Sequence, residues 1–120
     1  MEQGKITFSM AVNGRTDTIF RTDGRIDDGI LAFPDGTGGD YRIEFSDETV
    51  RVLRTGATAM DFAFKTGTAT NGVLTTAEGT IRVSATTRRL RVRNDRIELE
   101  YDLVDDGRVL SRHRMSIEWK

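Results

Sequence analysis

The fold is decided by the stretch RRLRVRNDRIELEYDLVDDGRVLSRHRMSIEW, residues 88–119. Between residues 97 and 103, apolar side chains occupy every second position and acidic side chains fill the positions between them. This period of two is typical of a β-strand with one face in the core and the other in water. The same period returns at residues 6–12, 50–54 and 81–85, and no stretch has a convincing helical period. Short strands separated by Asn-Gly and Asp-Gly turns predict an all-β sandwich or barrel.

The turn at Asn94-Asp95 fixes the register of the first hairpin in this stretch. If it contains two residues, four pairs follow: Val92 with Ile97, Leu90 with Leu99, Arg91 with Glu98, and Arg89 with Glu100. Apolar side chains then face apolar ones, and opposite charges meet on the outer surface. Each such cross-strand ion pair contributes only about 0.2–1 kcal/mol, so we expect these pairs to fix register more than stability.

The second hairpin turns at residues 105–107, where Gly107 can take the left-handed position of a G1 bulge. A three-residue loop gives six pairs: Leu103 with Val109, Tyr101 with Ser111, Leu99 with His113, Ile97 with Met115, Glu100 with Arg112, and Glu98 with Arg114. A two-residue loop is rejected because it would set Glu98 against Met115. The earlier hairpin at Asn13-Gly14 accommodates a loop of either two or three residues.

The composition bounds the class of protein. A chain of 120 residues suits one domain, residues 1–120. The absence of cysteine excludes disulfides and thiolate metal sites and suits a reducing compartment. Its 18 Lys and Arg residues balance 19 Asp and Glu residues, so no overall field attracts nucleic acid or lipid. With no signal peptide and no membrane span in the sequence, we expect a cytoplasmic protein without a membrane partner.

Six arginines crowd residues 82–96, which raises the question of an anion or nucleic-acid patch. The predicted register already pairs Arg89 and Arg91 with glutamates, and no aromatic side chain is interleaved to stack on bases. We therefore expect no nucleic-acid partner. The arginines left without a predicted partner are Arg88, Arg93 and Arg96.

His113 is the only histidine, and strict alternation places it on the inward face of its strand together with Val109 and Met115. One interpretation is a core histidine that is hydrogen-bonded inside the barrel. The other is a polar anchor in an apolar cavity, with Tyr101 and Ser111 beside it, because ligand sites combine apolar walls with a few convergent polar groups. The sequence leaves both interpretations open.

Catalytic and metal-binding patterns are weak. One histidine without cysteine excludes His-rich and Cys-rich zinc sites. The Cα atoms of Ser111 and His113 lie roughly 6.5 Å apart at strand rise, and no nucleophile elbow accompanies them, so we expect no catalytic residue. The glycine-rich residues 34–40 lack the lysine and helix of a phosphate loop and predict a mobile hairpin connection. Asp27-Asp28 alone is a weak calcium signal. We expect no metal and no cofactor.

Several further short motifs lie along the chain. They are Arg54-Thr55-Gly56-Ala57 followed by Met60 and Phe62, Gly79 with Ile81, Val83 and Thr86, the runs 97–102 and 113–117, and Phe20, Thr22 and Gly24. In this order and spacing the chain resembles the bacterial YwiB-like family over nearly its whole length, most closely from about Val50 to Trp119. The resemblance implies a calycin-type barrel of about eight or more antiparallel strands with a central space. The family has no assigned catalytic residue, and its pattern places a histidine at the position of His113.

The predicted fold class is all-β, a single antiparallel calycin-like barrel. Barrels of about eight strands fill with side chains or hold one small ligand. We predict a non-enzymatic, lipocalin-like binder of a small apolar or amphipathic molecule. The candidate ligand-binding residues are His113, Tyr101, Ser111, Trp119 and Met115, and the candidate walls are Phe8, Phe20, Met60, Phe62, Leu99, Met115 and Trp119. The alternative is a protein–protein interaction or structural module that acts through the barrel exterior. A homodimer is left open.

Overall fold

A computed structural model describes residues 2–120, with side chains from Gln3 onward. Its regular elements are ten strands: β1 (Glu2–Val12), β2 (Arg15–Asp27), β3 (Ile30–Pro34), β4 (Asp40–Phe45), β5 (Thr49–Thr55), β6 (Ala59–Lys65), β7 (Ala69–Thr76), β8 (Gly79–Val92), β9 (Arg96–Asp105) and β10 (Arg108–Trp119). Within this part of the chain, no helix has the length and apolar character needed to cross a membrane.

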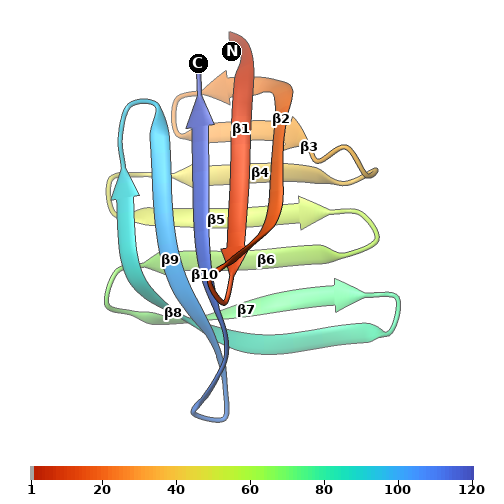
Figure 1. Cartoon of the computed structure of the whole chain (residues 1–120), viewed down its shortest axis with the longest axis vertical. Coiled ribbons are helices and arrows are strands. Elements are labelled where there is room, and N and C mark those ends of the chain that lie inside the picture. The colour runs from red at the N-terminus through yellow and green to blue at the C-terminus, as the bar shows by residue number, and fades with distance from the viewer. Residues whose placement is uncertain (1) are drawn as a thin grey trace.

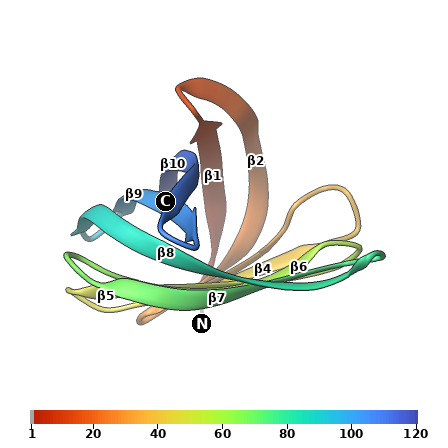
Figure 2. The ribbon, with the colours of Figure 1, turned by 90° about the horizontal axis from the view of Figure 1, so that it is seen from below.

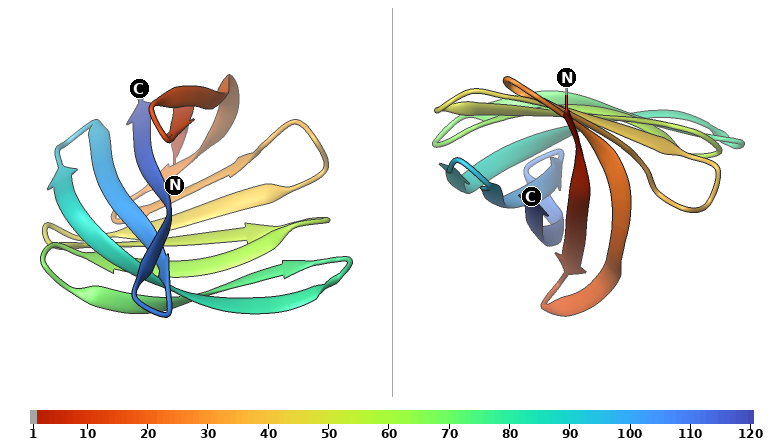
Figure 3. Two further views of the ribbon diagram at one scale, coloured as in Figure 1. Left: turned by 60° about the horizontal axis from the view of Figure 1, so that its bottom comes forward. Right: turned by 90° about the horizontal axis from the view of Figure 1, so that it is seen from above.

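The ten strands form one closed antiparallel barrel in the order β1-β10-β9-β8-β7-β6-β5-β4-β3-β2. Figure 1 shows two layers with crossing strand directions: β1, β9 and β10 follow the long axis, and β3 to β7 run across it behind them. The long strands β2 and β8 bend from one layer into the other, as the left view of Figure 3 also shows. This is orthogonal packing, in which bent strands make the corners. The predicted antiparallel barrel of eight or more strands is confirmed.

The two bends have local causes. In β8 the register with β9 shifts at Arg88, which is therefore a bulge residue where the strand turns. In β2 the bend falls at Gly24, after which the strand pairs with β3 as well as with β1. A Cβ atom on Gly24 would collide with the side chain of Ile6 and lie 2.8 Å from the carbonyl oxygen of Ala32. This bend therefore requires a residue without a side chain.

Two hairpins follow the sequence closely. All four predicted pairs between β8 and β9 are present, so that register is confirmed. The β1–β2 hairpin, which the sequence left open, has a two-residue turn. Its residues Asn13 and Gly14 have φ angles of 51° and 81°, and Val12 pairs with Arg15 across it. Positive φ at both central positions is the backbone of a type I′ turn.

The predicted β9–β10 register is wrong by two residues. The turn contains only Asp106 and Gly107, with φ angles of 50° and 76°, and a bulge at Leu110 then shifts the register further. The observed inward pairs are Leu103 with Ser111, Tyr101 with His113, Leu99 with Met115 and Ile97 with Ile117. A shift of two residues preserves which side chains face inward. The exception is Val109, which was expected inside and is 50% exposed beyond the bulge.

The core is a central belt of fully buried inward side chains. It includes Ile6, Leu31, Ile43, Val52, Ile97 and Ile117, all at 0% exposure. Inward side chains become partly buried toward the end that carries the β1–β2 and β9–β10 turns. We call this the hairpin end and define it by Met10, Phe20, Tyr41, Met60 and Leu74. Figure 2 shows the β1–β2 hairpin bending away here from the layer that contains β4 and β6.

The segment after β3 is a hairpin connection, as predicted, but one carboxylate ties it down. Asp35 Oδ1 accepts hydrogen bonds from the backbone N–H groups of Thr37 (2.8 Å) and Gly39 (3.0 Å). Arg54 pairs with Asp35 Oδ2, and its Nε lies 3.1 Å away. The Thr37 backbone bond and the Arg54 guanidinium lower the pKa of Asp35 well below its ordinary value. Arg54 also stands 5.6 Å from the centre of the Tyr41 ring, so this clamp positions one wall of the hairpin end.

Arg54→Met tests the clamp by removing its cation. We expect the free energy of unfolding to fall by about 2 kcal/mol, because Asp35 loses hydrogen bonds to a charged partner in a mostly enclosed place. The matched control is Arg42→Met, since the exposed Arg42–Glu44 pair (2.9 Å) should contribute less than about 0.5 kcal/mol. Urea unfolding measures both losses. Equal losses in the two variants would contradict a special stabilising role for the clamp.

Candidate functional site

Three inward side chains on neighbouring strands form a cross-strand row: Thr87 on β8, Tyr101 on β9 and His113 on β10. Tyr101 pairs directly with Thr87 on one side and with His113 on the other. Thr87 and Tyr101 are 1% and 3% exposed, whereas His113 is half-buried. Directly opposed residues on one face of a sheet have Cβ atoms about 5 Å apart, so the three side chains are immediate neighbours. We call them the polar row.

Ring contacts fix the direction of the middle of this row. The imidazole of His113 lies parallel to the Tyr101 ring, with a centroid distance of 4.8 Å and an interplanar angle of 3°. The Phe64 ring also contacts Tyr101, at a centroid distance of 4.4 Å and an angle of 40°. Contacts of this kind stabilise aromatic side chains beyond simple burial. The phenol and the imidazole are therefore held in defined orientations.

Two buried polar atoms of the row have no hydrogen-bond partner among the described residues: Thr87 Oγ1 and His113 Nδ1. The other imidazole nitrogen, Nε2, lies 2.7 Å from Ser111 Oγ. Buried polar groups in native proteins are almost always paired, so each exception needs an explanation. A hydrogen bond left unmade in the interior costs about 1–3 kcal/mol. The row thus presents a hydroxyl and a ring nitrogen that are available to a ligand or to ordered water.

The contact between Ser111 and His113 resembles one part of a catalytic site. A nucleophile and a base within hydrogen-bond reach also need a third group that orients the imidazole, together with donors for an oxyanion. The position of that third group is vacant, because His113 Nδ1 has no partner in the described structure. Residues 2–120 contain no group of three or more His, Asp or Glu side chains that could hold a metal ion.

Burial keeps the row uncharged at neutral pH. It lowers the pKa of His113, and the carboxylates of Asp17 and Asp102 offset only part of this effect. Burial also raises the pKa of Tyr101. The imidazole and the phenol are therefore both neutral. The row can donate and accept hydrogen bonds, but it offers a ligand no full charge.

Aromatic and methionine side chains line the hairpin end. The ring of Phe8 lies 5.2 Å from Phe20 and 5.0 Å from Tyr41, measured between centroids. Burial raises the pKa of Tyr41 and lowers that of His113, and the nearby Asp17 carboxylate acts upward on both. Apolar walls with a few polar groups are the composition of small-ligand sites.

The five candidate ligand-binding residues are separated along the barrel. Three of them come together at the hairpin end: His113, Tyr101 and Ser111. Met115 is enclosed in the core at 1% exposure. Trp119 packs against Phe45 at the far end of β10, with ring centroids 5.4 Å apart. Six residues of strand span about 20 Å, so Trp119 lies beyond the reach of a small molecule held by His113.

The candidate walls divide in the same way. Phe20 and Met60 line the hairpin end, whereas Phe8, Phe62 and Leu99 are buried in the central belt. Thr87 was missing from the candidates. Its inward position was readable, because the alternation of Val83 and Ala85 continues to residue 87. The sequence could not predict that the Thr87 hydroxyl lacks a hydrogen-bond partner, because this depends on the side chains of the neighbouring strands.

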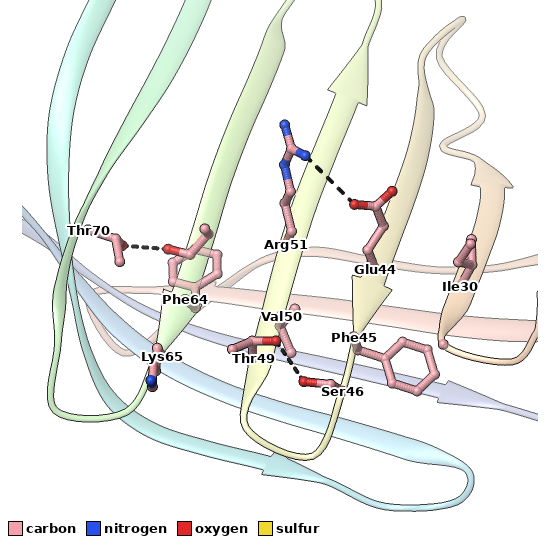
Figure 4. A pocket seen from close by; sticks show the side chains of 12 residues that line it. Ile30, Glu44, Phe45, Ser46, Thr49, Val50, Arg51, Phe64, Lys65 and Thr70 are labelled. Carbon is pink, nitrogen blue, oxygen red and sulfur yellow. Dashed lines mark hydrogen bonds and ion pairs between the residues drawn. The ribbon is translucent and has the colours of Figure 1, made fainter.

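Two hollows lie on the outer surface of the barrel. One, of about 540 Å³, crosses the outer faces of β4, β5 and β6 (Figure 4), and Arg51 and Glu44 form an ion pair of 3.8 Å beside it. The other, of about 660 Å³, lies over β2 to β5 and reaches the edge of Tyr41. Neither includes the polar row. A ligand at the hairpin end would therefore need the flexible side chains of Met10 and Met60 to make room.

Two of the three arginines that the sequence left without an assigned partner form ion pairs in the structure. Arg88, turned outward by its bulge, donates from Nε to Asp102 Oδ1 at 3.0 Å. Arg96 lies 2.8 Å from Glu118 and 3.1 Å from Glu98. These pairs depend on the bulge and on the shifted β9–β10 register. Neither feature can be predicted from the alternation of apolar and polar residues.

The pKa of His113 makes a prediction about pH and stability. The chain has one histidine and no cysteine, so His113 is the side chain expected to titrate between about pH 5 and 7.5. Its pKa is lowered on folding, so the unfolded chain takes up the proton first. The free energy of unfolding should therefore decrease as the pH falls below about 6.5.

Chemical unfolding at about pH 7.5, 6.5 and 5.5 measures this slope in the parent protein and in His113→Gln. The variant should lose the slope, because glutamine does not titrate. A slope of the same size in the variant would mean that another group is responsible.

Comparison with known proteins places the chain in a family. The family model described as a domain of unknown function (DUF1934) matches residues 35–117. Among solved structures, the ywiB protein from Bacillus subtilis matches with a TM-score of 0.70 and 21% sequence identity, over 98% of this chain and 89% of that one. The comparison with curated proteins gives no match. The family model spans well over half of the chain, and the barrel has the fold of the ywiB protein, so the chain belongs to the DUF1934 family, as the YwiB-like motifs predicted.

Proposed function

We propose that this barrel binds a small apolar or amphipathic molecule at its hairpin end and catalyses no reaction. The observation that carries the proposal is the pair of unpartnered buried atoms in the polar row, Thr87 Oγ1 and His113 Nδ1. A barrel selected for stability alone would gain if both residues were replaced by apolar side chains of similar shape. A ligand that completes their hydrogen bonds gives a reason for keeping them.

The depth of the row supports an amphipathic ligand. His113 is half-buried and Thr87 is almost fully buried, so a molecule entering at the hairpin end meets the imidazole first and the threonine hydroxyl last. Its apolar part would rest against Phe20 and the methionines. Methionine side chains are unbranched and adapt to irregular shapes. The polar part of the ligand would then complete the row.

The absence of catalysis is part of the same proposal. The hydroxyl of Ser111 has a base within reach, but the base has no orienting partner, and general base catalysis depends on that orientation. We propose no cofactor for the same site. The cytoplasm stays the proposed location because the chain has no cysteine.

An interaction module that acts through the barrel exterior is the second candidate. Residues 79–120 contain ten Lys and Arg and seven Asp and Glu, whereas residues 1–78 contain eight and twelve. The outer face of β8 to β10 is therefore basic relative to the rest of the barrel. Several of its arginines already pair within the chain, Arg88 and Arg96 among them. The interior site is the better supported of the two.

Thr87→Val tests the proposal because valine has the shape of threonine without the hydroxyl. Thr70→Val is the matched control: Thr70 Oγ1 donates to the carbonyl groups of Ala63 and Ala85. We expect Thr87→Val to raise the free energy of unfolding by about 1 kcal/mol and Thr70→Val to lower it by a similar amount. Urea unfolding of the protein without ligand measures both changes.

Binding is followed in the same proteins by native mass spectrometry after purification without denaturant, and by the fluorescence of added Nile red. The parent protein and Thr70→Val should carry a bound mass or take up the dye, and Thr87→Val should do so at least about tenfold more weakly. A parent protein that carries no extra mass and takes up no dye would contradict the proposal. Equal binding by all three proteins would mean that the polar row takes no part in binding.

A further inference from the structure

The charges around the polar row bear on the chemistry of the ligand's polar group, a question that rests on the proposed function. The row offers the hydroxyl groups of Thr87 and Tyr101 and the imidazole of His113. Burial favours the uncharged forms of the latter two. A full charge on a ligand would therefore find no opposite charge within the row, and burying an unpaired charge is costly.

The charged groups that act on the row from neighbouring strands are acidic. Asp17 on β2 and Asp102 on β9 both act on His113. Asp102 faces the outer surface, where the Nε of Arg88 lies 3.0 Å from its Oδ1. A second arginine, Arg112, lies 3.9 Å from the same oxygen, so the charge of Asp102 is offset by its own partners. A ligand carboxylate placed beside the imidazole would meet the unpaired field of Asp17, which opposes a negative charge.

The cation that points into the hairpin end is already engaged. The side chain of Arg54 is only 16% exposed and pairs with Asp35. It also donates to the carbonyl group of Thr58 and lies over the ring of Tyr41. To bind a ligand carboxylate, Arg54 would have to leave the clamp that ties down the 34–40 loop. Arg54 is thus not available to a ligand carboxylate without a structural loss.

An ammonium group is disfavoured for a different reason. Asp17 is exposed to solvent, and the carboxylate of Asp102 is held on the outer face by Arg88. Neither carboxylate reaches the buried end of the row at Thr87, which is 1% exposed. An ammonium group bound there would lose its hydration and gain only neutral partners.

We infer that the ligand carries an uncharged polar group that both donates and accepts hydrogen bonds, such as an alcohol, and that the barrel discriminates against a carboxylate or an ammonium group on the same apolar body. The threonine hydroxyl can donate or accept, and Nδ1 of a neutral imidazole donates in one tautomer and accepts in the other. A ligand hydroxyl satisfies either arrangement. The unpartnered atoms at Thr87 and His113 are the groups that such a ligand would complete.

The test is a competition among three molecules with the same twelve-carbon chain. Uncharged Nile red is bound to the parent protein at about pH 7.5, where His113 is neutral, and is displaced by 1-dodecanol, dodecanoate or dodecylammonium. We expect the dissociation constant of dodecanol to be at least about tenfold lower than that of either ion, because only the ions lose a full charge's hydration without compensation.

His113→Lys supplies the missing cation at the half-buried end of the row, and its matched control is Ser9→Lys, which adds the same charge on the outer face of β1. The first variant should reduce or reverse the preference for dodecanol over dodecanoate, and the second should leave the preference unchanged. If His113→Lys does not fold, the comparison in the parent protein decides by itself.

The outcomes separate this inference from the function on which it rests. Dodecanoate or dodecylammonium binding as tightly as dodecanol to the parent protein would overturn the inference and leave the binding function in place. A shift in preference that Ser9→Lys produces as strongly as His113→Lys would also overturn it, since long-range charge would then explain the selectivity. No dye uptake and no displacement by any of the three would overturn both.

Discussion

The pairing of β1 with β10 is the constraint on which the rest of the barrel depends. It joins the two ends of the chain in register, from Ile6 opposite Trp119 to Val12 opposite His113. Backbone hydrogen bonds between Lys5 and Lys120 extend this ladder at the terminal end. Without the pairing, both strands would be free edges and the sheet would not enclose a core. Because it also closes the longest loop in the chain, its entropy cost is met only when the other strands are in place.

Closure also decides where polar side chains end up. Once β10 lies between β9 and β1, its inward residues are covered from both sides, and His113 is pressed against Tyr101. The bend of β8 brings Thr87 to the other side of the same phenol. A polar side chain at an open sheet edge would be hydrated, whereas in a closed barrel it needs a partner from within. The unpartnered atoms of the row are thus a consequence of closure, and this is why they bear on function.

The alternating pattern predicted the fold class and one register correctly, and its failure in the other is instructive. Asn94-Asp95 gave the right β8–β9 pairs because nothing interrupts the ladder beside that turn. The β9–β10 pairs were off by two for two reasons: the turn has two residues and not three, and Leu110 is a bulge. The inward face of His113 survived this error because an even shift preserves parity.

The candidate site was only partly within reach of the sequence. Alternation assigns a side chain to a face but not to a position along the barrel, so it grouped Trp119 with His113 although His113 lies in the middle of β10 and Trp119 at its C-terminal end. The sequence also could not predict how deeply each inward side chain is buried. Met115 lies in the core and Met60 at the hairpin end because of the way the two layers close. The partners of Arg88 depended on the bulge at that residue.

The outer ion pairs and the inner row are two faces of the same three strands. Asp102 and Glu100 face outward next to Tyr101, and they pair with arginines from β8 and β10. The pairs of Glu100 are partly exposed and contribute about 0.2–1 kcal/mol each, whereas Asp102 is a buried residue, 8% exposed. The larger effect of the ion pairs is on register, because a slip of one residue would set the charged side chains against apolar ones and turn the row outward. The arginines of β8 and β10 therefore also affect the interior. By keeping the strands in register, they hold Thr87 and His113 level with Tyr101, so that the hydrogen-bonding groups of the row face a ligand together.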